Sequence, residues 1–240
     1  MKTTGTILIT GANRGIGLGL TAHFLARGWR VYAGCRRPDA AIELGALAAR
    51  HPGRCAVLAL EVRDDASVAA MAETIRARHD TLDVLVNNAG INPAPHEHRV
   101  AEVAVAAVAE AFDVNVLGAL RVLQAAVPLL RGRPHPRVVN ISSGGGSMTR
   151  NSAAPTRPMT AYCISKAGLN MLTVRAARDL PGFTIVSISP GWIRTDMGGP
   201  DAELDPDEAT AALATTIENL QASQHGQWLD RFGRPSEYAW

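Results

Sequence analysis

This 240-residue sequence has almost no excess of charge of either sign. Its 24 lysines and arginines nearly balance its 22 aspartates and glutamates, which leaves a formal net charge of +2. The charged residues are spread along the chain rather than gathered in one basic stretch. A weak and diffuse charge attracts a polyanion poorly, so we expect no nucleic-acid partner.

Long apolar runs and paired cysteines are also missing. No stretch approaches the roughly 20 apolar residues that cross a bilayer, and the first residues, MKTTG, lack the apolar core of a signal peptide. The three cysteines are an odd number and do not suggest a disulfide framework. We therefore expect no membrane partner and a reducing, cytoplasmic setting.

Motifs for metal binding and hydrolysis are absent as well. The seven histidines are scattered without the spacing of a metal site. No G-x-S-x-G turn is present for Ser-His-Asp hydrolysis, and no Gly-Lys-Ser/Thr follows the N-terminal glycines, which excludes a P-loop. We expect no metal, and the chemistry has to come from other residues.

Short apolar segments alternate with helical ones along the whole chain. Strands are expected at residues 6–10, 30–35, 55–60, 82–86, 137–141, 184–189 and 227–230. Helices are expected at residues 15–27, 39–49, 65–78 (capped by Asp65), 100–130, 161–180 and 207–221. This order predicts an α/β fold with a mostly or wholly parallel, doubly wound sheet of about seven strands and helices on both faces. No linker or repeat interrupts it, so residues 1–240 are expected to form a single domain.

Polar or glycine-rich residues follow most of the expected strands. In strand order they are Gly11, Arg36, residues 87–90, Ser143 and residues 190–191. Doubly wound sheets bind ligands outside the carboxyl ends of their strands. We therefore expect these residues to form one site.

Gly11, Gly15 and Gly17 form a G-x-x-x-G-x-G turn between the first strand and the first helix. Glycines permit a tight turn and a close backbone approach, and the helix N-terminus that follows can bind a pyrophosphate. The turn favours a dinucleotide, although a glycine-rich turn can also be no more than a turn.

The end of the second strand, GCRR at residues 34–37, contains no acid. An enzyme that uses NAD usually has Asp or Glu there for the ribose hydroxyls. Arg36, together with Arg14 inside the glycine turn, could instead clamp a 2′-phosphate. The sequence predicts a preference for NADPH/NADP+, with the alternative that both arginines are surface charges.

Tyr162 and Lys166 are four residues apart in an expected helix and so share one face. In a partly closed site, an ammonium about 4 Å from a phenolate stabilises it by about 4 kcal/mol. That is enough to bring the tyrosine pKa from about 10 to about 7. With Ser143 to polarise a carbonyl, the pair predicts proton transfer coupled to hydride transfer; alone, it is more often a surface pair.

Asn115 lies inside an apolar helical stretch, FDVNVLG at residues 112–118. Asparagine is a poor helix-interior residue because its side chain competes for backbone hydrogen bonds. We expect a local kink and a water that links Lys166 to solvent. The alternative is a core asparagine whose hydrogen bonds are satisfied.

Taken together and in this order, these motifs resemble the classical short-chain dehydrogenase/reductase family. The likeness covers nearly the whole chain. The spacing of 19 residues between Ser143 and Tyr162 places extra residues at 147–160 and is similar to the C-factor and sniffer-type carbonyl reductase subgroup.

The resemblance implies a Rossmann fold and the NADPH-dependent reduction of an aldehyde or ketone. It implies four catalytic residues: Tyr162 as proton donor, Ser143 as polariser, Lys166 lowering the tyrosine pKa and binding ribose, and Asn115 supporting a water relay. The implied cofactor-binding residues are Gly11, Asn13, Arg14, Gly15, Ile16, Gly17, Arg36, Glu61, Val62, Asn88, Ala89, Gly90, Tyr162, Lys166, Pro190, Gly191, Ile193 and Thr195.

Two other functions fit the same residues. One is an NADP-dependent alcohol dehydrogenase that works in the oxidative direction. The other is a non-enzymatic, cofactor-binding signalling protein, against which the intact Tyr162/Lys166 pair argues. The resemblance also implies a homodimer or homotetramer, formed through the apolar helices at residues 100–130 and 161–180.

Overall fold

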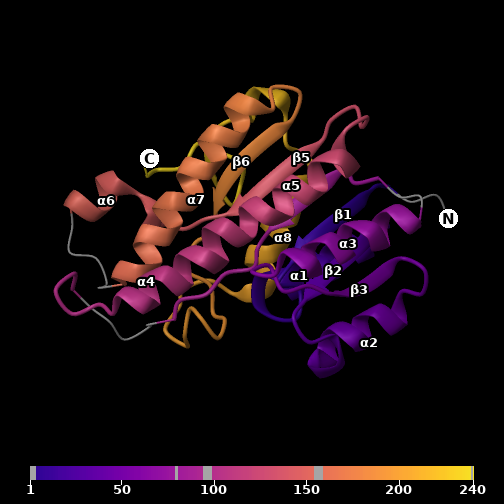
Figure 1. The fold of residues 1–240 in the computed structure, drawn as a ribbon, viewed down its shortest axis with the longest axis horizontal. Helices are drawn as coiled ribbons and strands as arrows, with labels where there is room; N and C mark the ends of the chain where they lie inside the picture. The colour runs from indigo at the N-terminus through magenta and orange to yellow at the C-terminus, as the bar shows by residue number, and fades with distance from the viewer. Residues whose placement is uncertain (1–3, 79–80, 94–98, 154–158, 239) are drawn as a thin grey trace.

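The computed structural model describes residues 4–78, 81–93, 99–153, 159–238 and 240. These residues form one seven-stranded sheet, all parallel, in the order β3-β2-β1-β4-β5-β6-β7 (Figure 1). The strands are β1 Thr6–Thr10, β2 Arg30–Cys35, β3 Cys55–Ala59, β4 Val84–Asn87, β5 Arg137–Ile141, β6 Thr184–Ser189 and β7 Trp228–Asp230. The predicted α/β fold with a parallel sheet is confirmed, and the strand ends differ from the prediction by at most two residues.

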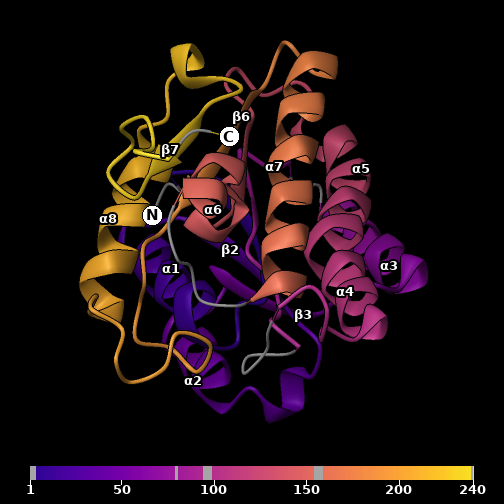
Figure 2. The same ribbon diagram turned by 90° about the vertical axis from the view of Figure 1, so that its left-hand side faces the viewer.

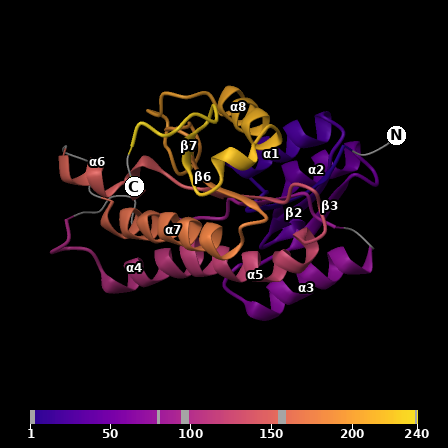
Figure 3. The same cartoon turned by 90° about the horizontal axis from the view of Figure 1, so that it is seen from above.

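Helices cover both faces of the sheet, as predicted. One layer holds α1, α2 and α8, and the other holds α3, α4, α5 and α7 (Figure 3). The helices are α1 Gly15–Ala26, α2 Ile42–Arg50, α3 Asp65–Ala77, α4 Val105–Phe112, α5 Ala119–Leu130, α6 Met148–Ala153, α7 Thr160–Asp179 and α8 Pro206–Glu218. No helix within the described ranges is long and apolar enough to cross a bilayer.

The sheet separates two hydrophobic cores. On β1, Ile7 and Ile9 join the core under α1 and α8, whereas Leu8 joins the core under α3 and α5. Successive strand residues point to opposite faces, so a strand that is apolar throughout is buried on both. This is the physical reason why the continuous apolar segments of the sequence predicted a covered parallel sheet.

The single helix predicted for residues 100–130 is three segments. It begins at Val105 rather than Val100, and α4 is separated from α5 by a π-helix, η2 Asp113–Gly118. Asn115 lies within η2, so the predicted local kink takes the form of a π-bulge, a common device at functional sites.

Several other helix predictions were incorrect, including the end of the helix expected at 207–221, which in α8 is Glu218. The N-cap of α3 is Asp64, whose carboxylate accepts a hydrogen bond from the backbone of Ala66, and Asp65 is the first helical residue. The helix expected at 39–49 is a 3₁₀ turn, η1 Pro38–Ala40, followed by α2, with the nonhelical Ala41 between them. Helix α6, inside the segment 147–160, was not predicted, and residues 154–158 of that segment lie outside the described residues.

Candidate active site

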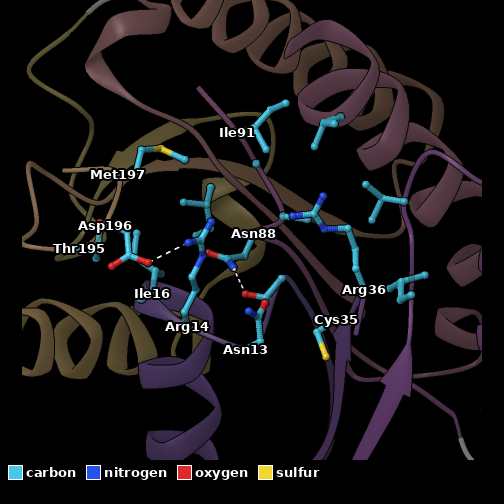
Figure 4. Close-up of a pocket in the computed structure, with 18 of the residues that line it drawn as sticks. Asn13, Arg14, Ile16, Cys35, Arg36, Asn88, Ile91, Thr195, Asp196 and Met197 are labelled. Carbon is cyan, nitrogen blue, oxygen red and sulfur yellow. Dashed lines mark hydrogen bonds and ion pairs between the residues drawn. The ribbon is translucent and has the colours of Figure 1, made fainter. Parts of the chain in front are cut away.

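A cleft of about 370 Å³ lies at the carboxyl ends of β1, β2 and β4, where the sequence placed the glycine turn (Figure 4). Residues of α7 and of the loop after β6 complete its walls. The predicted site residues that line it are Gly11, Asn13, Arg14, Gly15, Ile16, Arg36, Glu61, Val62, Asn88, Ala89, Gly90, Tyr162, Lys166 and Thr195. Residues of the glycine turn, the end of β2 and the loop after β4 therefore meet in one cleft, whereas Ser143, Pro190 and Gly191 are not among the residues that line it.

Other lining residues were not named from the sequence. They are Cys35, Arg37, Ala40, Leu60, Arg63, Ile91, Glu110, Val114, Ile141, Ser142, Asp196 and Met197. Most lie next to a predicted residue or at a strand end, so adjacency could have found them. Glu110 and Val114 come from α4 and η2, and only the packing of those helices brings them to the cleft.

Four residues predicted to bind the cofactor do not line the cleft. They are Gly17, Pro190, Gly191 and Ile193. A Cβ at Gly17 would clash with the carbonyl of Gly11, so Gly17 allows α1 to pack on the turn. Gly191 has φ +90° and Ile193 is buried, and both pack against the segment around Leu204. These residues shape the walls of the cleft instead of facing it.

The glycine turn adopts backbone conformations that a side chain would strain. Gly11 has φ +65° and Gly15 has φ +51°. A Cβ on Gly11 would lie 2.9 Å from the Cα of Ala89, so the turn and the loop after β4 meet backbone to backbone. The result is an open N-terminus of α1 directed at the cleft, which suits an anionic group.

Asn88 holds the loops after β1 and β4 together. Its side-chain amide donates to the carbonyls of Thr10 (2.8 Å) and Gly11 (3.1 Å). The Thr10 hydroxyl accepts in return from the backbone N–H groups of Asn88 (3.0 Å) and Ala89 (2.9 Å). The Asn88 side chain is thus occupied within the protein, and its contribution to the cleft is structural.

Four arginines border the outer part of the cleft. Arg14 forms an exposed ion pair with Asp196 at 2.8 Å (Figure 4), and Arg36 lies exposed at the end of β2. The other two, Arg37 and Arg63, were missed by sequence reasoning, although one adjoins Arg36. A surface of this kind favours a phosphate.

Glu61 faces this positive surface but is partly neutralised. Burial raises the pKa of Glu61, but hydrogen bonds from Arg63 and the charge of Arg36 outweigh it, so the pKa lies below its usual range. The Glu61 carboxylate accepts from the Arg63 side chain at 3.2 and 3.3 Å. The negative charge that a 2′-phosphate would meet is therefore paired.

Tyr162 and Lys166 lie on the cleft side of α7. The Lys166 Nζ is 5.5 Å from the centre of the Tyr162 ring and donates to the carbonyl of Ile141 at 2.8 Å. Burial lowers the pKa of Lys166 to about 8. Because this is above 7, the buried amine is mostly protonated at neutral pH.

The expectation that the tyrosine pKa is lowered is wrong for the protein by itself. Burial raises the pKa of Tyr162 to about 12, and a hydrogen bond with Ser143 offsets this only in part. A phenolate in a poorly solvated position loses its hydration, and here this cost exceeds the stabilisation from its neighbours.

Ser143, rather than Ser142, has its hydroxyl near Tyr162. The Ser143 Oγ accepts from the backbone N–H of Gly145 at 3.1 Å, and a Cβ on Gly145 would lie 3.5 Å from this oxygen and 3.6 Å from Tyr162 Cδ1. The Ser142 hydroxyl instead donates to the Asn170 side chain at 2.6 Å and is buried. Ser142 and not Ser143 is among the residues that line the cleft, but the hydroxyl beside Tyr162 is that of Ser143.

Asn115 lies behind the cleft and is 1% exposed. Its Oδ1 accepts from the backbone N–H of Ile91 at 2.8 Å, and its Nδ2 donates to the carbonyl of Ile91 at 2.9 Å and to Ser165 Oγ at 2.8 Å. A Cβ on Gly90 would lie 3.2 Å from Asn115 Oδ1 and 3.6 Å from Lys166 Nζ. The missing side chain of Gly90 thus leaves space beside both polar groups.

The residues present fit a dinucleotide. Gly11 and Gly15 present no Cβ to the cleft, the N-terminus of α1 faces inward, and the arginines offer a phosphate site. Tyr162 and Lys166 line the same cleft. Within the described ranges there is no group of three or more His, Cys, Asp or Glu residues that could hold a metal ion.

The sequence also matches known proteins. Residues 5–205 match the family model described as short chain dehydrogenase. The chain is 37% identical over 161 residues to C-signal of Myxococcus xanthus, which covers 66% of this chain and 93% of C-signal.

Two solved structures are similar over almost their full length. The carbonyl reductase Sniffer of D. melanogaster has a TM-score of 0.90 and 32% identity, covering 98% of this chain and 99% of Sniffer. An NADPH-bound carbonyl reductase from chicken fatty liver has a TM-score of 0.90 and 33% identity, covering all of both chains. With the family model matched over most of its length, the chain belongs to the short-chain dehydrogenase/reductase family and is an NAD(P)-dependent oxidoreductase.

Proposed function

We propose that this protein is an NADPH-dependent carbonyl reductase that reduces an aldehyde or a ketone. The observation that carries the proposal is that Tyr162 and Lys166 line the cleft together, with the Lys166 amine 5.5 Å from the centre of the tyrosine ring and the Ser143 hydroxyl beside that ring. Sniffer and the chicken enzyme are both carbonyl reductases, which supports the same substrate class.

The cofactor would lie along the cleft. The glycine turn and the N-terminus of α1 would hold the pyrophosphate, and Glu61, Val62 and Asn88–Gly90 would border the adenosine. Thr195, whose side chain lies close to Gly15, would contact the nicotinamide end of the cofactor. When bound, NADPH supplies the hydride.

Tyr162 provides the proton in this proposal. The substrate oxygen would accept hydrogen bonds from the hydroxyls of Ser143 and Tyr162, and the tyrosine proton would pass to that oxygen. The tyrosinate that remains is stabilised by the Lys166 ammonium. With a pKa raised to about 12 by burial, Tyr162 is protonated at neutral pH but is a weak acid, so the charge of Lys166 would have to stabilise the phenolate during the transfer.

Asn115 would act on the side of Lys166 and Tyr162 that faces away from the substrate. We assign it to a water relay that returns a proton toward Lys166, because the space left by Gly90 adjoins both Asn115 Oδ1 and Lys166 Nζ. The polar groups of the Asn115 side chain are used by Ile91 and Ser165, so the residue also fixes the wall of that space.

Arg36 and Arg14 would select NADPH by binding the 2′-phosphate. Arg14 is shared with Asp196, so Arg36 carries the larger part of the preference. Arg36→Asp should reverse or abolish the preference for NADPH over NADH, measured as the ratio of kcat/KM values, because a carboxylate repels the phosphate. An unchanged ratio would contradict this assignment.

The test of the proposed function follows NADPH absorbance with a panel of aldehydes and ketones. Wild type should turn over NADPH, and Tyr162→Phe should abolish turnover while still binding NADPH by fluorescence. Turnover only with alcohols and NADP+ would identify an oxidative dehydrogenase. Binding without turnover of any substrate would favour a signalling role.

We also propose a homodimer or homotetramer. An apolar surface, here called the α4–α7 face, is exposed on α4, η2 and α7, which lie side by side (Figure 3). Its residues are Val105, Phe112, Leu117, Ile164, Met171 and Val174. Exposed apolar side chains on adjacent helices are typical of a self-association surface. The three cysteines are free, which agrees with the cytoplasmic setting that we propose.

A further inference from the structure

The turn that follows Ser143 consists of three successive glycines, Gly144–Gly146 (η3). Glycine has the largest choice of backbone conformations, and this turn is held by few bonds of its own: the N–H of Gly146 donates to the carbonyl of Ser143 at 2.8 Å, and that of Ser147 to the carbonyl of Gly144 at 3.2 Å. The Ser143 hydroxyl depends on the turn directly, because it accepts the N–H of Gly145 at 3.1 Å. Side chains that pack on the turn therefore add to these bonds in setting the position of Ser143.

From inside the protein, two asparagines hold the turn. Asn151 of α6 donates to the carbonyl of Gly145 at 2.9 Å, and Asn170 of α7 donates to the carbonyl of Gly146 at 3.3 Å. These contacts reach the second and third glycines. Gly144, the residue directly attached to Ser143, is held by neither of them.

The C-terminal segment reaches Gly144 from the other side. After β7, the backbone of Ser236 donates to the carbonyl of Trp228 at 2.8 Å, which folds the segment back. The ring of Trp240 then stacks on that of Trp228 with centroids 5.4 Å apart. The end of the chain consequently lies beside α6 (Figure 2). The segment from β7 to the end of the chain lies beyond residues 5–205, the part that matches the family model.

Tyr238 and Arg150 form the contact itself. The guanidinium of Arg150, on α6, lies 4.7 Å from the centre of the Tyr238 ring. A Cβ on Gly144 would lie 2.7 Å from Tyr238 Cε2 and would also clash with Arg150 Nη1. Both side chains thus fill the space that a side chain at Gly144 would occupy.

We propose that Tyr238 and Arg150 are positioning residues for Ser143. Resting on the proposed function, this means that the C-terminal segment clamps the glycine turn between Tyr238 and α7 and so orients the hydroxyl that polarises the substrate carbonyl. The clamp joins α6 to the segment after β7, two parts of the chain that are separate in sequence.

Kinetics of three variants test the clamp. Tyr238→Ala should lower kcat roughly 10- to 100-fold with KM for NADPH unchanged, since a small misplacement of a catalytic group has this effect. Tyr238→Phe should restore kcat, because the ring and not the hydroxyl makes the contact. Phe232→Ala removes another exposed aromatic ring of the same segment, one flanked by Arg231 and Arg234, and should leave kcat unchanged.

Alkylation of Cys163 tests the clamp by a measurement that does not depend on enzyme activity. A Cβ on Gly145 would lie 3.3 Å from the Cys163 Sγ, so the turn covers this thiol. Iodoacetamide should label Cys163 faster in Tyr238→Ala and in Arg150→Met than in wild type or Phe232→Ala. Labelling of Cys55, on β3 at the far edge of the sheet, serves as internal reference by mass spectrometry and should not change.

The two measurements separate the two proposals. If wild type reduces no carbonyl but Cys163 is exposed by Tyr238→Ala, the clamp stands and the proposed function fails. If wild type is active, and Tyr238→Ala changes neither kcat nor the labelling rate of Cys163, the clamp is wrong. Equal loss of kcat in Tyr238→Ala and Tyr238→Phe would also contradict it.

Discussion

At the scale of single residues, burial decides the chemistry of the site. It lowers the pKa of Lys166 to about 8 and raises that of Tyr162 to about 12. At neutral pH the phenol is therefore protonated and the amine still carries its charge, although burial favours the neutral form of both groups. For Tyr162 to act as an acid near neutral pH, its phenolate has to be stabilised, and the Lys166 ammonium is the positive charge nearest to its ring in this proposal.

The pKa of Lys166 predicts how reduction depends on pH. Because kcat/KM reports groups of the free enzyme, it should fall above about pH 8 as Lys166 loses its proton. Tyr162 remains protonated throughout this range. The measurement is kcat/KM for NADPH-dependent reduction between pH 6 and 10. Lys166→Arg should move the fall in kcat/KM to higher pH, because a guanidinium stays charged throughout this range. A profile in which kcat/KM does not fall would contradict the assignment of the fall to Lys166.

The same pKa predicts how stability depends on pH. The folded pKa of Lys166 lies below the unfolded value of 10.5, so between about pH 8 and 10 the unfolded chain binds more protons. The free energy of unfolding should then rise with pH, by an amount approaching about 3 kcal/mol for this residue over the full range. Lys166→Met should lose this rise. Urea unfolding of both proteins at pH 7 and pH 10 measures it, and parallel behaviour would refute it.

At the scale of elements, the π-helix η2 shows how an irregularity positions a site. The extra residue in the turn turns Asn115 inward, where it completes the hydrogen bonding of the loop after β4 through Ile91. Sequence reasoning left open whether Asn115 is functional or only a satisfied core residue. Its side chain is fully hydrogen-bonded, and the function in a water relay stays a prediction.

Replacing Asn115 should show how much the loop depends on η2. Asn115→Leu leaves the N–H and carbonyl of Ile91 without their partners in a buried place, so we expect a loss of about 2–4 kcal/mol in the free energy of unfolding. Asn219→Ala, at the exposed end of α8, should cost about 0.5 kcal/mol or less. Denaturant unfolding checks both, and equal effects of the two substitutions would contradict this account.

At the scale of the whole molecule, two features involve distant parts of the chain. One is the clamp of the C-terminal segment on the glycine turn, and the other is the exposed α4–α7 face. Such a face costs free energy in water until something covers it. In our proposal a second copy of the chain covers it, which also places two active sites in one assembly.

A charge on the α4–α7 face should separate the subunits. Met171→Glu puts a carboxylate on a residue that is 55% exposed, and sedimentation velocity should show a monomer where wild type is a dimer or tetramer. Ile42→Glu changes an even more exposed residue on α2, outside this face, and should leave the assembly intact. A wild type that sediments as a monomer would overturn the proposed oligomer.

Most of the architecture could be read from the sequence because it rests on local patterns. Continuous apolar strands such as Thr6–Thr10 and Thr184–Ser189 need only their own residues to indicate a sheet buried on both faces. The glycine turn and the Tyr162/Lys166 spacing are equally local, since a turn and one face of a helix are set by nearest neighbours along the chain.

Tertiary packing decided the features that local sequence patterns do not determine. It set the direction of both pKa shifts, because burial depends on the whole fold. It split the helix predicted at 100–130 at η2, and it showed that Gly17 and Gly191 pack rather than face the cleft. It also brought Tyr238 to Gly144, a contact between residues 94 positions apart that no periodic sequence pattern predicts. A sequence indicates which residues can do chemistry, but distances and solvent exposure arise only when distant segments pack together.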